Sequence, residues 1–560
     1  MKKISIINLE HTTKGNYINA CKHAFDELEI ESLLKIKPQY ISGNMMKFKP
    51  IDFFVADLPT ICHRLDIFED LLEFKEIYNL FIDILPIICG LREMDKRKEE
   101  PYNFIEYIYS IRELSLYTDC IVKFHDTLFA LEEKVKSTGL KHLITYIKTI
   151  FESEEFQNLQ TNLKSMDFRL KPIKSITVGV NLNLNANDQI IGDIGILSIN
   201  QQRIKSGKSI ISRVLRETEL EQPDQFLAAV DTIFKPSLET AILNGVNIQR
   251  RSQEIQQGTI TPTSPIFKGL DAQTKEALNL NFKKAINTAL KRTLKNVDYE
   301  IFDYVKKNTT FLADLLPELS FLIAGVDFIN KMQGLNIAIC KPQVSEDSYS
   351  AIKNLKNPHL LTTMKSEEIR ENDVSFDNDG MIYVLTGANS GGKSIFLQSV
   401  GIAQVLFQLG LYVPATDATL STSEHLCVHF PSKVAIEVDG GRLEQECKMI
   451  SKVIKEASST SFVLMDETFS STSAYDASIL AEATLKHLAS IGCKGIFSTH
   501  IHNLDQAIDE INEHEKTIVK VDSLLAVTEA GNRSYRVVRG RSEGHSHAKD
   551  IAQKYGLLFD

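Results

Sequence analysis

Residues 387–394 have the composition and spacing of a loop that binds phosphates. Its glycines let backbone N–H groups turn inward around phosphate oxygens, and the lysine beside them reaches the outer two phosphates. The serine hydroxyl that follows is a suitable ligand for Mg²⁺. In order, the segment consists of Gly387, Ala388, Asn389, Ser390, Gly391, Gly392, Lys393 and Ser394. It predicts a site for a nucleoside triphosphate with Mg²⁺, and a strand-to-helix turn that binds nothing is the alternative.

An acidic pair and a histidine occur later in the chain, each after a short apolar run. Asp466 and Glu467 follow the run 461–465, and His500 follows the run 494–498. A carboxylate such as Asp466 can hold Mg²⁺, and its neighbour Glu467 can polarise the attacking water. We expect His500 to contact the γ-phosphate.

The elements that must position these residues are strands that alternate with helices. Apolar runs at 381–385, 461–465 and 494–498 predict buried strands of a mostly parallel sheet, with helices between them. Ligands of such sheets bind at the carboxyl ends of the strands, so we expect the loop, the acidic pair and the histidine to meet around one triphosphate. The predicted fold of residues 336–560 is therefore an α/β P-loop NTPase domain of the ABC-like type.

The region before this domain has a different pattern. Apolar residues recur at helical spacing from residue 56 to residue 335. Around 171–200, β-branched residues alternate with small ones, and Asn-Ala-Asn-Asp has the composition of a turn between two strands. We predict a mainly helical region with a small β insert at 171–216. Residues 1–55 receive no assignment.

Composition and charge limit the classes of function. The chain has 560 residues, 43% of them hydrophobic and 24% charged, which is typical of a globular protein with several domains. Eight cysteines without a CxxC pair predict buried, reduced thiols. No apolar run is long enough for a signal peptide or for a membrane span of ~18 residues, so we predict a cytoplasmic protein. The formal net charge of −10 means that binding to nucleic acid requires a local basic surface.

One segment supplies such a surface. Residues 171–216 contain seven basic and two acidic residues, a net charge of +5. Arg203, Lys205 and Lys208 are the candidates for contact with DNA phosphates, which give affinity without sequence information. Lys208 belongs to a second Gly-Lys-Ser, but Gln202 stands where a phosphate loop requires its first glycine, so we interpret that stretch as a surface turn.

Three stretches together resemble the ATPase domain of the MutS family of DNA mismatch-repair proteins. They are TGANSGGKS, LMDETFSSTSAYDA and FSTHIHNL, which begin at Thr386, Leu464 and Phe497. The resemblance implies ATP as the nucleotide and a homodimer in which a loop of one subunit completes the ATP site of the other. It also implies that the helical region acts as core and lever, and that ATP binding and hydrolysis switch the grip of the protein on DNA.

The chain departs from the family in two respects. In the place of the trans-acting loop, Asp439 to Glu444, the family's serine or threonine is replaced by Leu443 and Glu444. Either hydrolysis is slow, or the contact to the γ-phosphate comes from another residue such as Arg442. The chain before the ATPase region is too short for the family's mismatch-recognition and connector domains. We therefore expect a mismatch-independent function, for example on branched or recombination DNA. The last segment, 544–560, is expected to form a helix at the dimer interface.

Two other functions fit parts of the sequence. An ATP-gated protein-interaction module that never binds DNA fits the net charge of −10, although the basic segment counts against it. An ABC-transporter subunit is disfavoured because no LSGGQ-like motif precedes Asp466. The histidine pairs His500/His502 and His545/His547 lack a third ligand at the spacing of a metal site.

Overall fold

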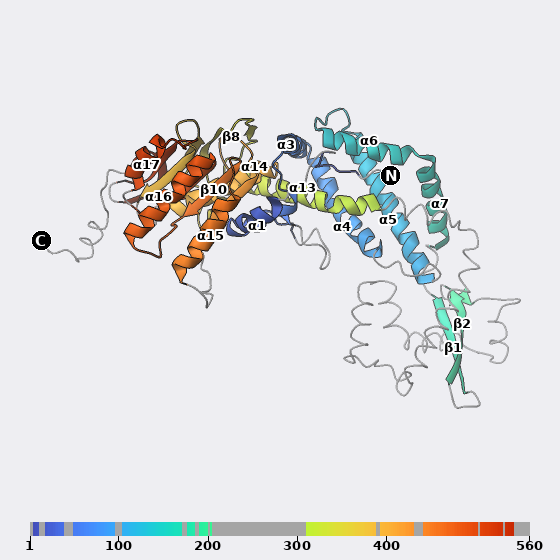
Figure 1. Ribbon diagram of the computed structural model, residues 1–560. Helices are drawn as coiled ribbons and strands as arrows, with labels where there is room; N and C mark the ends of the chain where they lie inside the picture. The colour runs from blue at the N-terminus through green and yellow to red at the C-terminus, as the bar shows by residue number, and fades with distance from the viewer. Residues whose placement is uncertain are drawn as a thin grey trace. The chain divides into compact units, whose positions relative to one another are not determined.

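The structure is a computed structural model, drawn as a ribbon in Figure 1. The described residues separate by their contacts into two compact units. We call the described parts of Gly90–Val122 and Thr149–Thr310 the helical unit, and those of Lys2–Cys89, Lys123–Lys148 and Phe311–Asp560 the sheet unit. The residues that the structure describes are 4–9, 17–37, 49–95, 104–170, 176–184, 190–199, 202–203, 310–387, 392–430, 441–501, 504–529 and 532–541.

The helical unit contains long helices followed by a β hairpin. Tyr117 of α5 and Phe156 of α7 pack edge to face, with ring centroids 6.2 Å apart. The hairpin strands are antiparallel, and a short third strand ends at Arg203. Lys205, Lys208 and the rest of the insert to residue 216 lie outside the described residues. The elements are α5 (Phe104–Phe129), α7 (Glu154–Leu170), β1 (Ile176–Leu184), β2 (Ile190–Ile199) and β3 (Gln202–Arg203), with α5 extending into the sheet unit.

A six-stranded sheet forms the centre of the sheet unit. Its strand order is β13-β12-β7-β11-β10-β9, and all neighbours are parallel except β12 and β13. Every residue of β10 and β11 is buried, which explains why these strands have continuous apolar runs rather than alternating patterns. The three predicted strands correspond to β7, β11 and β10. The strands are β7 (Ile382–Gly387), β9 (His425–His429), β10 (Ser461–Asp466), β11 (Lys494–Ser498), β12 (Val521–Glu529) and β13 (Asn532–Arg539).

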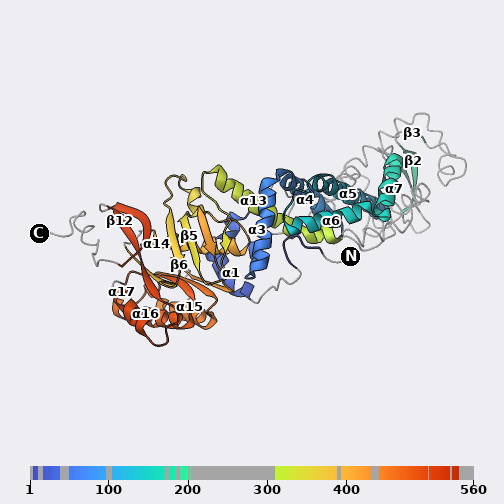
Figure 2. The same cartoon turned by 90° about the horizontal axis from the view of Figure 1, so that it is seen from above.

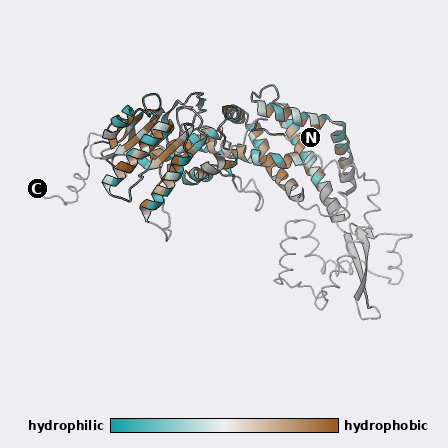
Figure 3. Cartoon of the chain, viewed as in Figure 1, coloured by the Kyte–Doolittle hydropathy of each residue, from teal (hydrophilic) through white to brown (hydrophobic). Residues whose placement is uncertain are grey.

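Helices cover both faces of this sheet. Helix α14 (Lys393–Gln408) packs on one face, where Leu464 reaches within 2.9 Å of the position that a Cβ atom on Gly401 would take. The opposite face carries α15 (Arg442–Glu456), α16 (Ala474–Ile491) and α17 (Leu504–Glu513), which lie on the same side in Figure 2. Figure 3 shows hydrophobic strands in the sheet, whereas the covering helices also carry hydrophilic residues. This is the layered arrangement expected for an α/β domain.

A second, four-stranded sheet lies against the first, with the order β4-β8-β5-β6. Lys494, the first residue of β11, joins the two sheets, because its Nζ atom donates to the hydroxyls of Ser350 at 3.1 Å and Ser421 at 2.6 Å. The elements of the four-stranded sheet are β4 (Gln343–Val344), β5 (Ser350–Leu355), β6 (Asn372–Phe376) and β8 (Asp417–Leu420), with the 3₁₀ helix η4 (Pro358–Thr362) after β5.

The N-terminal residues that the sequence left unassigned belong to the sheet unit. Helix α1 (Tyr17–Glu27) packs against β9, the edge strand of the large sheet, and α2 (Ile30–Leu33) follows it. The N–H group of Leu426 in β9 donates to the sulfur of Cys21 at 3.4 Å. Part of the segment 1–55 therefore covers the edge of the large sheet.

The sheet unit also contains helices other than those on the faces and the edge of the large sheet. Helix α3 begins where the Asp57 carboxylate accepts from the N–H group of Thr60 at 3.0 Å. Among the described residues, no helix is long and apolar enough to cross a membrane. All eight cysteines are thiols outside any disulfide. Cys62 is exposed on α3, and Cys340 and Cys447 are half-buried, so the prediction that all are buried is wrong for these three. The elements are η2 (Pro50–Phe53), α3 (Leu58–Glu73), α4 (Lys75–Asp95), α6 (Thr138–Glu152) and α13 (Thr310–Gly334), of which α4 and α6 also enter the helical unit.

Candidate active site

The predicted phosphate loop runs from the end of β7 to the start of α14. Gly387 has a φ of 130° and Gly392 a φ of 93°, a backbone region that favours glycine. A Cβ atom on Gly387 would lie 2.7 Å from the carbonyl oxygen of Ala526, so β12 leaves no room for a side chain there. The residues between these glycines, Ala388, Asn389, Ser390 and Gly391, lie outside the described part of the chain.

Lys393 is the first residue of α14, and its side chain is buried. Its Nζ atom donates to the Gly387 carbonyl at 2.9 Å and lies 3.4 Å from Nδ1 of His500. Burial lowers the pKa of Lys393, while the negative charges of Glu467 and Asp466 act to raise it. The lysine is thus a desolvated cation held near two acidic residues, at a point where an anionic ligand would meet little competition from water.

Asp466 ends β10 beside Ser498 of β11 and is 1% exposed. Burial raises the pKa of the Asp466 carboxyl group, while the neighbouring hydroxyl groups of Ser394 and Ser498 lower it. Within the described residues, the Oδ1 atom of Asp466 and the hydroxyl of Thr386 have no hydrogen-bond partner. A buried carboxylate oxygen without a partner, close to hydroxyl groups, fits Mg²⁺, which takes oxygen ligands and retains several waters.

Glu467 and His500 form a close pair next to this carboxylate. Oε1 of Glu467 lies 2.5 Å from Nε2 of His500, and the other ring nitrogen faces Lys393. Because the ammonium group of Lys393 can only donate, Nδ1 of His500 accepts and Nε2 carries the proton that points to Glu467. Glu467 also has a φ of 45°, an uncommon backbone conformation that is found at functional sites.

The loop after Glu467 is fixed at several points. Phe469 has a φ of 65° and is 3% exposed, so it anchors the loop in the core. The Ser471 hydroxyl donates to Glu446 of α15 at 2.7 Å, and Ser473 caps the start of α16. Sequence reasoning missed Phe469 and Glu446, because neither the backbone angle nor a contact between distant segments is visible in a motif.

The structure brings Lys393, Ser394, Asp466, Glu467 and His500 together at the carboxyl ends of β7, β10 and β11. Their chemical roles remain predictions.

Tyr535 of β13 also borders the loop, and sequence reasoning missed it. Its Cδ1 atom lies 3.3 Å from the position that a Cβ atom on Gly392 would take. Its carbonyl accepts from Nδ2 of Asn372 at 3.2 Å, and its φ is 56°. Asn372 also accepts from the N–H group of Val537 at 2.7 Å and so holds β13 in place, a contact between distant segments that no local pattern shows.

The loop that resembles the family's trans-acting loop leads into α15. Asp439 and Gly440 lie outside the described residues, as does the side chain of Arg442. Leu443 packs against the hydrophobic core beneath α16, and Glu444 pairs with Lys448 at 2.7 Å. Leu443 therefore has a packing role in its own chain.

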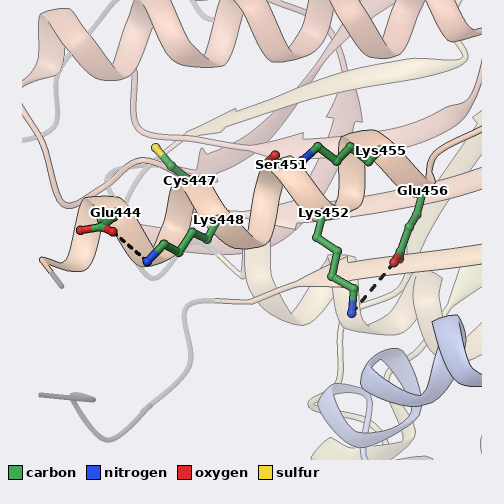
Figure 4. Close-up of a pocket in the computed structure, with 7 residues that line it drawn as sticks. All are labelled: Glu444, Cys447, Lys448, Ser451, Lys452, Lys455 and Glu456. Carbon is green, nitrogen blue, oxygen red and sulfur yellow. Dashed lines mark ion pairs between the residues drawn. The ribbon is translucent and has the colours of Figure 1, made fainter. Parts of the chain in front are cut away.

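A shallow depression of about 500 Å³ runs along α15 (Figure 4). Glu444 and Lys448 pair across one turn, and Lys452 lies 4.0 Å from Glu456 across another. Within each pair the opposite charges compensate each other, and exposed ion pairs of this kind add little stability. The depression is lined by Glu444, Cys447, Lys448, Ser451, Lys452, Lys455 and Glu456.

The described residues contain no group of three or more His, Cys, Asp or Glu side chains that could hold a metal ion. His502, His545 and His547 lie outside the described part of the chain, as does the segment 544–560. The candidate Mg²⁺ ligands are therefore Asp466 and the Ser394 hydroxyl, which is a set that relies on phosphate and water oxygens for its remaining ligands.

Comparison with protein families gives two matches. The family model of MutS domain V matches residues 383–557, which include the phosphate loop, the acidic pair and the histidine. The family model of the MutS2 N-terminal domain matches residues 56–335, half of the chain.

Curated relatives agree with these matches. Endonuclease MutS2 of Caldanaerobacter subterraneus subsp. tengcongensis is 23% identical over 545 residues, which cover 95% of this chain and 62% of the relative. The DNA mismatch repair protein MutS of Shouchella clausii is 26% identical over 269 residues, 46% of this chain and 31% of the relative. That of Lactobacillus delbrueckii subsp. bulgaricus is 29% identical over 228 residues, 40% of this chain and 26% of the relative. The chain spans less than two thirds of the length of these relatives.

Proposed function

This chain belongs to the MutS family, and from that premise we propose that it binds ATP with Mg²⁺, hydrolyses it, and uses this cycle to switch its grip on DNA. The observation that carries the proposal is the contact of three separate segments at one sheet edge. His500 lies 3.4 Å from Lys393 and 2.5 Å from Glu467, and Asp466 precedes Glu467 in the chain. These are the residue types that phosphoryl transfer to water requires.

Each residue has a defined task in this proposal. Lys393 binds the outer phosphates, and Ser394 with Asp466 holds Mg²⁺, which neutralises charge on the phosphate oxygens. Glu467 orients the attacking water and accepts its proton, while His500 holds the Glu467 carboxylate in position. His500 contacts the γ-phosphate once the phosphates take Lys393 away from Nδ1 and that nitrogen carries a proton. The partners of Lys393 include the neutral Gly387 carbonyl and the His500 ring. A phosphate oxygen competes well with both, because it is negatively charged and forms an ion pair with the ammonium group, whereas these two acceptors are neutral.

The experiment that tests this function compares wild type with Glu467→Ala in a steady-state ATPase assay. Loss of a general base lowers turnover by about 10²-fold to 10⁴-fold, so we expect kcat to fall by that factor. Because Glu467 does not bind the phosphates in this proposal, the affinity for ATP should stay within about threefold of wild type. An unchanged kcat would assign the water to another residue.

DNA is the proposed partner, through the basic segment 171–216. Its net charge of +5 contrasts with −10 for the whole chain. Phosphate binding releases counterions, so reversing the charge of Arg203, Lys205 and Lys208 should weaken DNA binding. It should also reduce the slope of log affinity against log salt by about 0.9 for each phosphate that the protein no longer neutralises. Filter binding at several salt concentrations measures both quantities. Unchanged affinity and slope would remove this surface from the proposal.

A homodimer with composite ATP sites is part of the proposal. Leu443 is packed in its own chain, so we infer that a contact from one subunit to the γ-phosphate of the other uses a different residue, with Arg442 as the candidate. An Arg442→Ala variant that dimerises normally and hydrolyses ATP at the wild-type rate would contradict this assignment.

An ATP-gated protein-interaction module without DNA binding is the second candidate, and the net charge of −10 favours it. Gel shifts with homoduplex, branched and mismatched DNA, with and without ATP, separate the two. DNA binding that changes with nucleotide supports the first function. A lack of binding to all three substrates, together with ATP turnover, supports the second.

A further inference from the structure

The first described residues of the chain, 4–9, are clamped by a buried carboxylate. We call these residues the N-terminal strap. Ile6 and Ile7 are both 0% exposed, and their N–H groups donate to Oε2 of Glu318 in α13 at 2.7 and 3.4 Å. The Ser5 hydroxyl donates to Oε1 of the same side chain at 2.7 Å. On the other side, a Cβ atom on Gly139 would lie 2.3 Å from the Ile6 carbonyl oxygen, so the strap fits tightly against α6.

Arg64 of α3 holds the strap from a second direction. Its guanidinium group is 1% exposed, with Nε donating to the Ile7 carbonyl at 3.1 Å and Nη2 to Oδ1 of Asn8 at 2.9 Å. Its third nitrogen, Nη1, donates to the carbonyls of Phe53 and Leu409. One rigid guanidinium fork therefore joins the strap, the end of η2 and the residue after α14.

The contact with Leu409 reaches the helix that begins at the candidate active site. Helix α14 starts at Lys393 and ends at Gln408, so Leu409 is its C-cap. Gly410 has a φ of 76°, and a Cβ atom there would lie 2.5 Å from Cβ of Arg64. The main chain at Gly410 therefore packs directly against the Arg64 side chain.

Gln408 strengthens the same junction. Its side-chain Nε2 atom donates to the Val55 carbonyl at 2.9 Å, and its main-chain carbonyl accepts from the N–H group of Val55 at 3.3 Å. The C-terminal end of α14 is thus bound to the segment just before α3. A helix of 16 residues is a rod of about 24 Å, so a displacement at Lys393 moves Leu409 as well.

These contacts differ from those of an arginine that only balances a buried charge. Arg64 donates to main-chain carbonyls of three segments that lie far apart in sequence, so its position depends on all three at once. The strap also lies before both regions matched by the family models, residues 56–335 and 383–557. We propose that the N-terminal strap, Arg64 and the end of α14 form one cooperative unit, which passes the nucleotide state at Lys393 to α3 and α13. The transfer of the nucleotide state rests on the proposed function.

Hydrogen exchange of the full chain without nucleotide, measured by mass spectrometry, tests whether the strap, Arg64 and the end of α14 form one cooperative unit. Asn8→Ala removes one hydrogen bond from Arg64 at a partly buried position, so the fold should tolerate it. A hydrogen bond to a charged group corresponds to about a tenfold change in an opening equilibrium. We expect exchange at residues 4–9 and at Leu409 to Leu411 to accelerate together by about that factor, and Arg64→Lys to have the same effect. The control is Asp66→Asn, also in α3, which turns the ion pair with Lys341 at 2.8 Å into a contact with a neutral acceptor and should change neither segment.

Acceleration in the strap alone, with Leu409 to Leu411 unchanged, would show that the two segments open independently and would overturn the proposal. The transfer of the nucleotide state is tested by adding a non-hydrolysable ATP analogue with Mg²⁺, which should slow exchange in both segments of the wild type but not of Arg64→Lys. Nucleotide affinity is measured in parallel by equilibrium dialysis. Binding without any change in the strap would overturn the relay, whereas absence of binding would count against the proposed function and leave the result without nucleotide to decide the cooperative unit.

Discussion

Two buried lysines of the sheet unit have nearly equal exposure, 4% for Lys393 and 5% for Lys494, but opposite surroundings. Lys393 lies near the negative charges of Asp466 and Glu467, which counteract the lowering of its pKa by burial. Lys494 has two serine hydroxyls and the ring of Phe462 as partners, and burial lowers its pKa to about 7.

These surroundings show which buried charge can act on a ligand. Lys494 is at the amino end of β11, between two sheets, whereas the site residues lie at the carboxyl ends of the strands. Lys494 therefore shows that a strongly perturbed pKa alone does not mark a functional group. Position at the sheet edge and acidic neighbours are what set Lys393 apart.

Replacing each lysine with methionine should separate the two roles most clearly. Lys393→Met removes charge-assisted bonds to two phosphates, so the Kd for ATP should rise on the order of 100-fold. Lys494→Met is the matched control and should leave the Kd within about twofold, because its side chain is remote from the strand ends. Titration with a fluorescent ATP analogue measures both. Similar increases in Kd for the two variants would mean that buried charge, and not its location, governs nucleotide binding.

A serine pair on α14 tests the same distinction at the metal site. Ser394→Ala removes a proposed Mg²⁺ ligand, so the Mg²⁺ concentration for half-maximal ATPase activity should rise about tenfold. Ser399→Ala removes only a hydroxyl that donates to the Ile395 carbonyl of the same helix at 2.6 Å, and it should leave the Mg²⁺ dependence unchanged. If the two variants behaved alike, Ser394 would not be a ligand.

The smallest expected effect concerns stability and pH. The pKa of Lys494 is about 7 in the folded state and 10.5 when the side chain is exposed to water, so between these pH values the unfolded chain binds a proton that the folded chain does not. The contribution of Lys494 to the free energy of unfolding therefore rises with pH in that window. Below pH 7 the side chain is charged in both states, so the folded state carries the full cost of burying the charge.

The measurement is urea unfolding of wild type and Lys494→Met from pH 6 to pH 9. Taking the difference cancels other titrating groups, and wild type should gain on the order of 1 kcal/mol relative to the variant as pH rises from 7 to 9. At pH 6 the variant should be at least as stable as wild type, because the hydroxyls of Ser350 and Ser421 lie 3.1 Å apart and can pair with each other. A flat difference would show that Lys494 stays charged when buried.

Much of the site was predictable because its signals are local. Continuous apolar runs identify β7, β10 and β11, and parallel strands bring their ends to one edge, so the convergence of Lys393, Asp466 and His500 follows from their positions after those runs. The hairpin of β1 and β2 is also a local pattern.

Features that depend on distant partners could not be predicted in this way. Cys21 contacts Glu424, 403 residues away, and no periodicity in residues 1–55 identifies β9 as the surface that α1 covers. The left-handed φ of Glu467, directly after β10, is a backbone angle that the residue types around it do not indicate. The run 494–498 predicts a buried strand, but nothing in it shows that the Lys494 side chain binds Ser350 and Ser421 of distant segments.

The contact between α1 and β9 has a consequence for assembly. An uncovered edge strand offers N–H and C=O groups to any extended peptide, which is how sheets recruit foreign strands and how fibrils start. At Leu426 the outward N–H group is taken by the Cys21 thiol, and the helix above it blocks the approach of another backbone. Strand addition at β9 is thereby closed to other molecules as long as α1 stays docked.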